Sequence, residues 1–178
     1  MIISGIFRQW YALHTRSRFE NVVLEGLGRK EVEVFLPRIT IQSRRLDRKK
    51  MIQVPLFPGY LFVKTSLSPH EHLEIVKTTG VVTFVGNLQG PDAIPVESIE
   101  SLKIMVLNSQ EILSGIKFKH GDPVRVVSGP FAGVWGEFVR YRGKGRVVVN
   151  IAAMGQNAAV DVSKEDIEII RDNHLITA

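Results

Sequence analysis

The residues with the most distinctive spacing in this chain are aromatic and basic, and such residues suit binding better than covalent chemistry. The stretch 56–63 reads Leu-Phe-Pro-Gly-Tyr-Leu-Phe-Val and places Phe57, Tyr60 and Phe62 within six positions. It follows the segment 44–50, which has five basic residues and one acid. Rigid aromatic rings are favoured interface anchors, and a basic run attracts a phosphate backbone. The alternatives are a packed strand for the aromatic stretch and a solvated loop for the basic run.

Residue patterns typical of enzymes do not occur in the sequence. The histidines stand at positions 14, 70, 72, 120 and 174, and no motif places an acid or a nucleophile beside His14. His70 and His72 are two positions apart, so they do not share a helix face. The chain has no phosphate-binding loop, no nucleophile elbow and no cysteine. We therefore expect no catalytic residue, no metal site and no cofactor.

Composition and charge indicate a folded protein of one domain or two small ones. The chain has 178 residues, of which 44% are hydrophobic and 23% charged. Of the formal net charge of +5, residues 1–108 carry +4 and residues 109–178 carry +1. The longest apolar runs have four residues, whereas a membrane span needs about 20. The first residues lack the layout of a signal peptide, so we expect a cytoplasmic monomer without a membrane segment.

Helix signals occur twice in the first part of the chain. Ser17 and Glu20 have the spacing of a capping box, and Gly28 suits the left-handed residue that ends a helix. Ser68 followed by proline repeats the start signal, and Gly80 ends the second helix. Strands are predicted at 10–14, 32–34, 51–54, 60–63 and 81–85. This order predicts an α+β fold of the split βαβ type with an antiparallel sheet, followed by a third helix over 95–108.

Beyond residue 108 the pattern changes to short strands and turns. Residues 109–119 have no periodicity and are predicted to be a linker. Strands are predicted at 124–127, 135–141, 146–152 and 159–162. Such close spacing favours a small β-barrel. The valine run at 147–149 favours strand over helix, so we do not expect this part to switch to a helical form.

The chain resembles the NusG family of transcription elongation factors and, within it, specialised paralogues of the RfaH and UpxY type. The resemblance rests on WYAL at 10–13, PLFPGYLFV at 55–63, GV at 80–81, FVG at 84–86, GDPVRV at 121–126 and GPFAG at 129–133. It implies an NGN domain over 8–108 that binds RNA polymerase, the linker over 109–119, and an SH3-like KOW barrel over 120–172 that recruits a further partner. The family binds without covalent chemistry.

The resemblance also implies site residues. Aromatic side chains of the NGN domain line an apolar depression for the clamp helices of the largest polymerase subunit, namely Phe57, Tyr60, Phe62 and Phe84. Residues expected to face the upstream DNA fork or the non-template strand are Arg16, Arg29, Lys30, Thr78 and Thr79. In the KOW barrel, Met154 and Gly155 occupy the loop through which the family binds the ribosome or Rho. The RfaH pattern has a His-Thr-Thr triplet where this chain has Glu71, His72 and Leu73.

These expectations describe an antitermination factor that suppresses pausing or termination at a subset of operons. The physical basis is a coupling free energy between a polymerase-binding site and a nucleic-acid-binding site. The alternative is a stand-alone RNA-binding module with a KOW barrel, associated with the ribosome. The segment GYLFV at 59–63 partly fits the RNA-recognition strand pattern, but Pro58, Leu61 and Thr65 depart from it.

Overall fold

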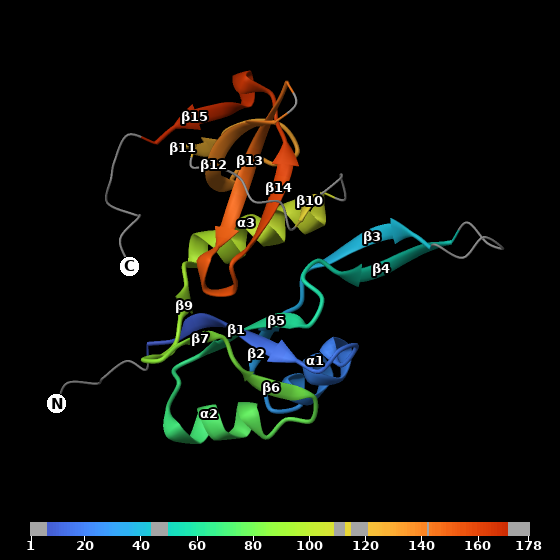
Figure 1. Ribbon diagram of the computed structural model, residues 1–178, viewed down its shortest axis with the longest axis vertical. Coiled ribbons are helices and arrows are strands. Elements are labelled where there is room, and N and C mark those ends of the chain that lie inside the picture. The colour runs from blue at the N-terminus through green and yellow to red at the C-terminus, as the bar shows by residue number, and fades with distance from the viewer. Residues whose placement is uncertain (1–6, 44–49, 109–112, 115–120, 142, 171–178) are drawn as a thin grey trace. The chain divides into compact units, whose positions relative to one another are not determined.

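The computed structural model describes residues 7–43, 50–108, 113–114, 121–141 and 143–170, and Figure 1 labels most of its helices and strands. The chain divides into two compact units, residues 1–96 and residues 97–178. Both contain antiparallel sheets, and helices are few, so the predicted α+β class is confirmed.

An antiparallel sheet with the strand order β2-β5-β1-β6 forms the centre of the N-terminal unit. A fifth strand, β9, pairs with β1 off this path. The strands are β1 Gln9–Thr15, β2 Glu33–Phe35, β5 Tyr60–Thr65, β6 Val81–Phe84 and β9 Ala93–Ile94. With α1 and α2 between them, β1, β2, β5 and β6 follow the predicted order of strands and helices.

The pairing register divides the side chains of this sheet between two faces. Leu13 pairs with both Leu61 and Phe84, whereas the next residue back, Ala12, pairs with Phe62. Directly opposed residues of an antiparallel pair share a face, and neighbours along a strand alternate. Phe62 therefore lies on the face opposite Leu61 and Phe84. The Leu61 face packs against α1 and α2 in a core of Tyr11, Leu13, Val23, Leu27, Leu61, Val63, Ile75 and Phe84.

Helix α2 (Pro69–Val76) begins as predicted, but α1 (Glu20–Gly28) does not. The side chain of Ser68 accepts a hydrogen bond from the Glu71 amide at 3.3 Å, with proline at the first helical position. Helix α1 instead begins after Phe19 and has no side-chain cap. The capping box predicted at Ser17 is wrong because Arg18 adopts a left-handed φ of 66° between Ser17 and the helix.

The predicted end of α1 at a left-handed Gly28 is also wrong. Gly28 belongs to the helix, Arg29 caps it in a right-handed conformation, and the positive φ of 58° occurs later, at Glu31. The end of the second helix was predicted more closely. Gly80, predicted to end it, has a left-handed φ of 95° and lies four residues after the last residue of α2.

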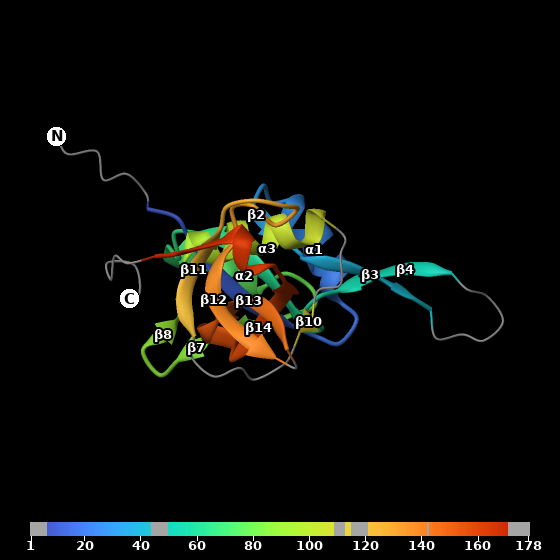
Figure 2. The same cartoon turned by 90° about the horizontal axis from the view of Figure 1, so that it is seen from above.

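Strands β3 (Arg38–Gln42) and β4 (Met51–Pro55) pair with each other, and with no other described strand, and form a ribbon. Figure 2 shows the ribbon extending away from the other elements of its unit. Strand β3 is not among the strands predicted from the sequence. Most of the basic run, 44–49, lies outside the described residues. A second short ribbon pairs β7 (Gly86–Asn87) with β8 (Gly90–Pro91).

The C-terminal unit is a small SH3-like barrel preceded by α3 (Val96–Leu107), which begins one residue before the unit. Its six-stranded sheet has the order β10-β14-β13-β12-β11-β15. The strands are β10 Leu113–Ser114, β11 Asp122–Val126, β12 Trp135–Tyr141, β13 Lys144–Ile151, β14 Gln156–Asp161 and β15 Ile167–Ile169. Strand β10 falls inside the predicted linker and pairs with β14. The rest of that linker lies outside the described residues.

Helix α3 contacts the barrel through a buried hydroxyl. Ser101 Oγ donates to the carbonyl oxygen of Trp135 at 3.3 Å and accepts from the Trp135 amide at 2.9 Å. Ile104, one turn further along the same helix face, reaches Gly133, where a Cβ would lie 3.0 Å from its Cδ1 atom. Ser101 is completely buried, so this contact is shielded from water.

Candidate functional site

Three of the predicted anchor residues share one face of the N-terminal sheet. Tyr60 and Phe62 lie two positions apart on β5, and the ring of Phe57 meets that of Phe62 edge-on with centroids 6.1 Å apart. Phe35 of β2 stacks on Phe62 at 6.0 Å. These residues, Phe35, Phe57, Tyr60 and Phe62, are called the aromatic face below.

The structure does not show the open apolar depression that was expected at the aromatic face. Phe57 is 1% exposed and Phe62 is completely buried. Tyr60 is half-buried and packs against His14, with ring centroids 5.2 Å apart. Of the three predicted anchors on this face, Tyr60 is therefore the accessible one.

Phe84, the fourth predicted anchor, does not join the aromatic face. It lies on the helix-covered side of the sheet, where its ring meets Tyr11 edge-on at 6.2 Å. On its other side it stacks on His72 of α2 at 5.0 Å. Phe84 is thus a core residue of the sheet and helices, and the prediction that it lines the same depression is corrected.

A buried carboxylate holds the turn that precedes Tyr60. Gly59 has a positive φ of 83°, a conformation that glycine adopts without strain. Its amide donates a 2.7 Å hydrogen bond to Glu20 Oε1 at the start of α1. Glu20 is only 6% exposed. The Glu20 side chain, predicted to belong to a helix cap, therefore positions the Pro58-Gly59 turn instead.

Of the two basic residues expected to contact nucleic acid at the end of α1, Lys30 is held by a carboxylate, whereas Arg29 stays exposed. Lys30 Nζ lies 3.2 Å from Glu74 Oε2 and donates to the Glu74 carbonyl oxygen at 2.6 Å. These contacts lower the pKa of Glu74. Arg29 lies 4.0 Å from Glu25, and both side chains are exposed.

The cationic residues near the start of α1 have a different environment. Arg16, Arg18 and Arg38 form no ion pair with any residue in the described part of the chain. Arg16 and Arg18 are exposed, whereas Arg38 is half-buried and donates a hydrogen bond to Asn21 Oδ1. Helix α1, about 13 Å long, separates these residues from Arg29 and Lys30. The structure therefore does not gather the predicted basic residues into one cluster.

The two predicted threonine contacts differ. Thr78 is 7% exposed, its hydroxyl donates to the Glu74 carbonyl oxygen at 3.0 Å, and its methyl group packs against Gly26. Thr78 therefore joins α2 to α1 and is not available to nucleic acid. Thr79 is exposed, beside Gly80, whose carbonyl oxygen accepts from the Arg16 amide at 2.8 Å.

Glu71, which stands where the RfaH triplet begins, is bound within the protein. Its carboxylate accepts hydrogen bonds from Thr65 Oγ1 at 2.7 Å and from the amide and hydroxyl of Ser66 at 3.0 and 2.9 Å. Arg8 donates to the other oxygen at 2.6 Å. The bond from Thr65, followed by that from the Ser66 amide, lowers the pKa of Glu71 to about 2. Glu71 thus joins β5, α2 and the residue before β1.

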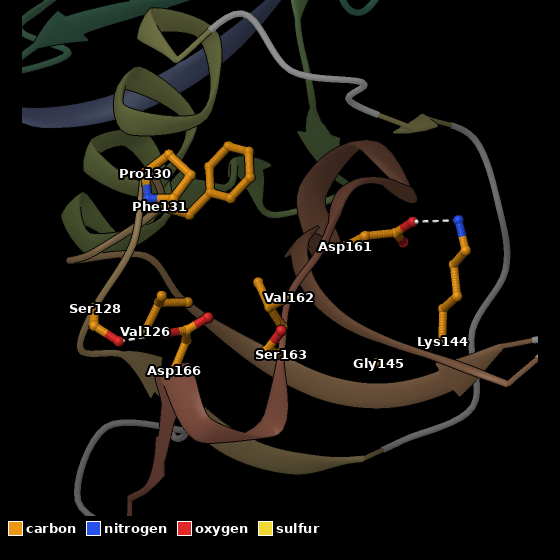
Figure 3. Close-up of a pocket in the computed structure, with 10 residues that line it drawn as sticks. All are labelled: Val126, Ser128, Pro130, Phe131, Lys144, Gly145, Asp161, Val162, Ser163 and Asp166. Atoms are coloured by element: carbon orange, nitrogen blue, oxygen red, sulfur yellow. Dashed lines mark hydrogen bonds and ion pairs between the residues drawn. The ribbon is translucent and has the colours of Figure 1, made fainter.

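A polar hollow of about 530 Å³ lies on the C-terminal barrel (Figure 3). Ser128 donates a hydrogen bond to Asp166 on one side, and Lys144 forms an ion pair with Asp161 at 3.6 Å on the other. Its residues are Val126, Ser128, Pro130, Phe131, Lys144, Gly145, Asp161, Val162, Ser163 and Asp166. The residues that line this hollow do not include Met154 or Gly155, the predicted partner site.

The predicted partner site, Met154 and Gly155, lies at the turn between β13 and β14. Met154 ends a short 3-10 helix and is half-buried, and the exposed Gly155 has φ 60°. The Lys144 and Asp161 side of the hollow lies at the other end of the same two strands. The two features are therefore separate candidates for a partner.

Two further features limit the classes of site that the structure supports. No cluster of three metal-ligating side chains occurs among residues 7–43, 50–108, 113–114, 121–141 and 143–170. Within the same residues, no helix has the length and apolar character to cross a membrane.

A split βαβ sheet with an aromatic face, followed by a small barrel, defines a two-unit α+β protein. The family model described as transcription termination factor NusG matches residues 8–103. The transcription termination/antitermination protein NusG of Thermus thermophilus is 32% identical over 88% of this chain and 96% of its own length. The protein of the same name from Bacillus subtilis is 27% identical over 90% of this chain and 98% of its own.

The fold agrees with these sequence matches. A solved structure of Thermotoga maritima NusG covers 93% of this chain and 99% of its own, with a TM-score of 0.54 and 24% identity. The chain belongs to the NusG family of transcription termination/antitermination factors. This membership agrees with the prediction of a transcription factor rather than an enzyme.

Proposed function

We propose that this protein binds RNA polymerase through the aromatic face, contacts nucleic acid at the transcription bubble and suppresses pausing or termination. The clamp helices of the largest subunit are the proposed polymerase element. The observation that carries the proposal is the convergence of Phe57, Tyr60 and Phe62 on one sheet face, away from the core that packs against α1 and α2. Clustered aromatic side chains are the usual anchors of protein interfaces.

The burial of Phe57 and Phe62 sets a condition on this proposal. Their rings meet a partner only when they become exposed, whereas Tyr60 is accessible without any change. Tyr60 therefore provides the first contact, and the two phenylalanines add buried area once the face is open. The binding free energy measured for the full chain includes the cost of that opening.

The remaining parts of the proposal concern specificity. We place the protein with the specialised RfaH and UpxY paralogues, acting at a subset of operons, because Met154 stands where general NusG proteins have an aromatic residue. Methionine is flexible and polarizable, and it fills a partner's pocket in place of a ring. The barrel then recruits a further partner, the ribosome or Rho, through Met154 and Gly155. A cytoplasmic monomer is the proposed form.

The test is a pull-down of purified RNA polymerase by the full-length protein and by three variants. Tyr60→Ala and Phe62→Leu should each weaken polymerase binding, Tyr60→Ala by about tenfold or more, as expected for a truncated interface anchor. Phe84→Leu is the matched control, since it makes the same change in a buried ring on the opposite face. Equal binding by wild type and Tyr60→Ala, or an equal loss in Phe84→Leu, would contradict the proposal.

Transcription in vitro then tests the outcome of binding. The wild-type protein should shorten pauses and increase read-through at terminators, and Tyr60→Ala should not. Templates with different upstream sequences test the restriction to a subset of operons. A protein that binds RNA but not polymerase, and leaves pausing unchanged, would instead support the RNA-binding alternative.

A further inference from the structure

The ribbon formed by β3 and β4 has one aliphatic face and one mostly polar face. Its register places Ile39 opposite Val54 and Ile41 opposite Ile52. Directly opposed residues of an antiparallel pair share a face, so these four side chains lie together. They are called the aliphatic patch below. The opposite face carries Arg38, Thr40, Gln42, Met51, Gln53 and Pro55.

The aliphatic patch has no core to pack against among the described residues. None of its four side chains belongs to the core of the N-terminal sheet, and no other described helix or strand has extensive contacts with β3 or β4. Ile41 and Ile52 are 37% and 36% exposed, on a ribbon that extends away from the other elements of its unit (Figure 2). Single exposed apolar residues are ordinary, but here two cross-strand pairs form one continuous strip. A two-stranded ribbon is marginally stable by itself, so covering this strip would stabilise it.

The size of the aliphatic patch argues against a second copy of the chain as the occupant. Five-residue strands span roughly 17 Å, and two strands spaced roughly 4.8 Å apart give the face an area of roughly 160 Å². Each partner in a stable dimer buries about 800 Å². Two ribbons packed face to face would fall far short of that area. The patch fits a short segment of a different protein, held by a few apolar side chains.

The charge around the patch specifies the chemistry of that segment. Residues 38–55 contain six basic side chains and one acidic one, a net charge of +5 that equals the net charge of the whole chain. Arg38 begins β3, and Lys50 directly precedes β4. A positive field of this kind attracts acidic partners and repels basic ones. The complementary segment therefore combines an apolar stripe with flanking aspartate or glutamate side chains.

An amphipathic helix matches the shape of the aliphatic patch better than a strand does. A strand added to either edge would widen the ribbon and leave the patch uncovered. A helix rises about 1.5 Å per residue, so about 11 residues span the roughly 17 Å of the ribbon. Apolar residues at i, i+3, i+4 and i+7 form a stripe along such a helix, and this stripe covers both cross-strand pairs.

We propose that the aliphatic patch docks an acidic amphipathic helix of a partner protein. The inference goes beyond the proposed function, because it assigns the N-terminal unit a second protein-binding surface that does not include the aromatic face. Affinity comes from burial of Ile41 and Ile52 against the apolar stripe, and the cations of the ribbon select acidic partners.

The experiment measures binding of a fluorescent synthetic peptide to the full-length protein by anisotropy. The peptide has about 14 residues, with leucines at i, i+3, i+4 and i+7, glutamates on the opposite face and alanines elsewhere. Two further peptides serve as controls. One has the same composition with the leucines rearranged so that they do not share a face, and the other has lysine in place of each glutamate. Both should bind at least about tenfold more weakly than the first peptide.

Ile41→Thr combined with Ile52→Thr tests the patch itself. Threonine keeps the β-branched shape that suits a strand and removes apolar surface, so peptide affinity should fall by about fivefold or more. The melting temperature should stay within about 3 °C of the wild type, because neither isoleucine belongs to the core. Gln53→Thr is the matched control, since it places the same residue on the polar face and should leave peptide affinity unchanged.

Polymerase binding distinguishes this inference from the proposed function. The double threonine variant should bind RNA polymerase as the wild type does in the pull-down, because Tyr60 is unchanged, and Tyr60→Ala should bind the peptide as the wild type does. Failure of the peptide to bind the wild type refutes the inference and leaves the proposed function standing. Loss of polymerase binding in the double variant would assign the patch to the polymerase contact and overturn the idea of a separate site.

Three other results would also overturn the inference. The first is equal binding of the rearranged peptide, which would indicate attraction by charge alone. The second is self-association of the wild type that the double variant abolishes, measured by sedimentation, since the occupant would then be a second copy. The third is a loss of DNA binding in the double variant together with unchanged peptide affinity, which would assign the patch to nucleic acid.

Discussion

Glu20 of α1 and Gly59 of the turn before β5 are joined by a 2.7 Å hydrogen bond from the Gly59 amide to the Glu20 carboxylate. The bond joins residues 39 positions apart and is the reason why a charged side chain is buried at the start of a helix. It holds the turn that leads into Tyr60, so it connects the stability of the N-terminal unit with the placement of its aromatic face.

Glu20→Ala should destabilise the protein by about 1 kcal/mol, the usual net contribution of a hydrogen bond, because the partly buried Gly59 amide loses its acceptor. Glu20→Gln keeps an oxygen that accepts from Gly59 and should cost less. Urea denaturation of both variants measures the difference. Equal losses would show that the carboxylate charge, rather than the hydrogen bond, matters at this position.

Glu71 should make the stability of the protein dependent on pH in the acid range. Its pKa is about 2 in the folded protein against 4.5 ordinarily, because Thr65 and Ser66 donate to the carboxylate. A group with a lowered folded pKa stabilises the protein fully above its unfolded pKa and loses that contribution as pH falls through the folded value. The destabilisation caused by Glu71→Gln should therefore be largest at neutral pH, shrink below about pH 4.5 and disappear near pH 2.

Urea denaturation at a series of pH values gives this profile. Glu25→Gln is the control, because the one ion pair of Glu25 among the described residues is a 4.0 Å contact with exposed Arg29. Exposed ion pairs of this kind contribute little, so the control should shift stability by less than about 0.5 kcal/mol at any pH. A Glu71→Gln difference that does not vary with pH would contradict the assignment.

Ser101→Ala should lower the free energy of unfolding by weakening the contact between α3 and the barrel. The variant removes both hydrogen bonds to the Trp135 backbone, and the site is sealed from water that would replace them. The expected loss is about 1–3 kcal/mol. Hydrogen exchange of the Trp135 amide should speed up in the variant. Ser98→Ala is the control, because Ser98 lies on the same helix but forms no such bond to a described residue, and it should leave the exchange rate of the Trp135 amide unchanged. Faster exchange of the Trp135 amide in Ser98→Ala as well would indicate a general loosening of the helix.

Gly26 and Thr78 should show strong coupling in a double-mutant cycle. A Cβ on Gly26 would lie 2.8 Å from Thr78 Cγ2, so Gly26→Ala should destabilise the wild type by about 1 kcal/mol or more. Thr78→Ser removes that methyl group. In the Thr78→Ser background the helix preference for alanine over glycine should dominate, and Gly26→Ala should become stabilising. Thermal denaturation of the four proteins tests this change of sign, and additive effects would refute the contact.

Sequence patterns predicted the order of strands and helices well, because apolar/polar alternation along a strand and the Ser68-Pro69 helix start depend on interactions between residues that are close in sequence. The predictions from sequence patterns were wrong where a side chain forms a contact with a residue far away in the sequence. The carboxylate of Glu20 was assigned to a helix cap, but it bonds to Gly59, which is remote in sequence. Strand β3 was overlooked although Ile39 and Ile41 alternate with polar residues, because this alternation covers only five positions. The pairing of Lys30, which follows α1, with Glu74 of α2 left no trace in the spacing. The left-handed Arg18 has no signal at all in residue type.

The alternation along β5 also restricts which changes of chain length this protein tolerates. One residue inserted into β5 would rotate every later side chain by half a turn, sending Phe62 toward the helices and Leu61 or Val63 toward the outer surface. Core packing and the proposed binding of a partner would be lost together, since they depend on opposite faces of one strand. Among the described strands, β3 and β4 pair with each other and with no strand of the main sheet, so residues inserted or deleted between them should leave the register of β5 unchanged.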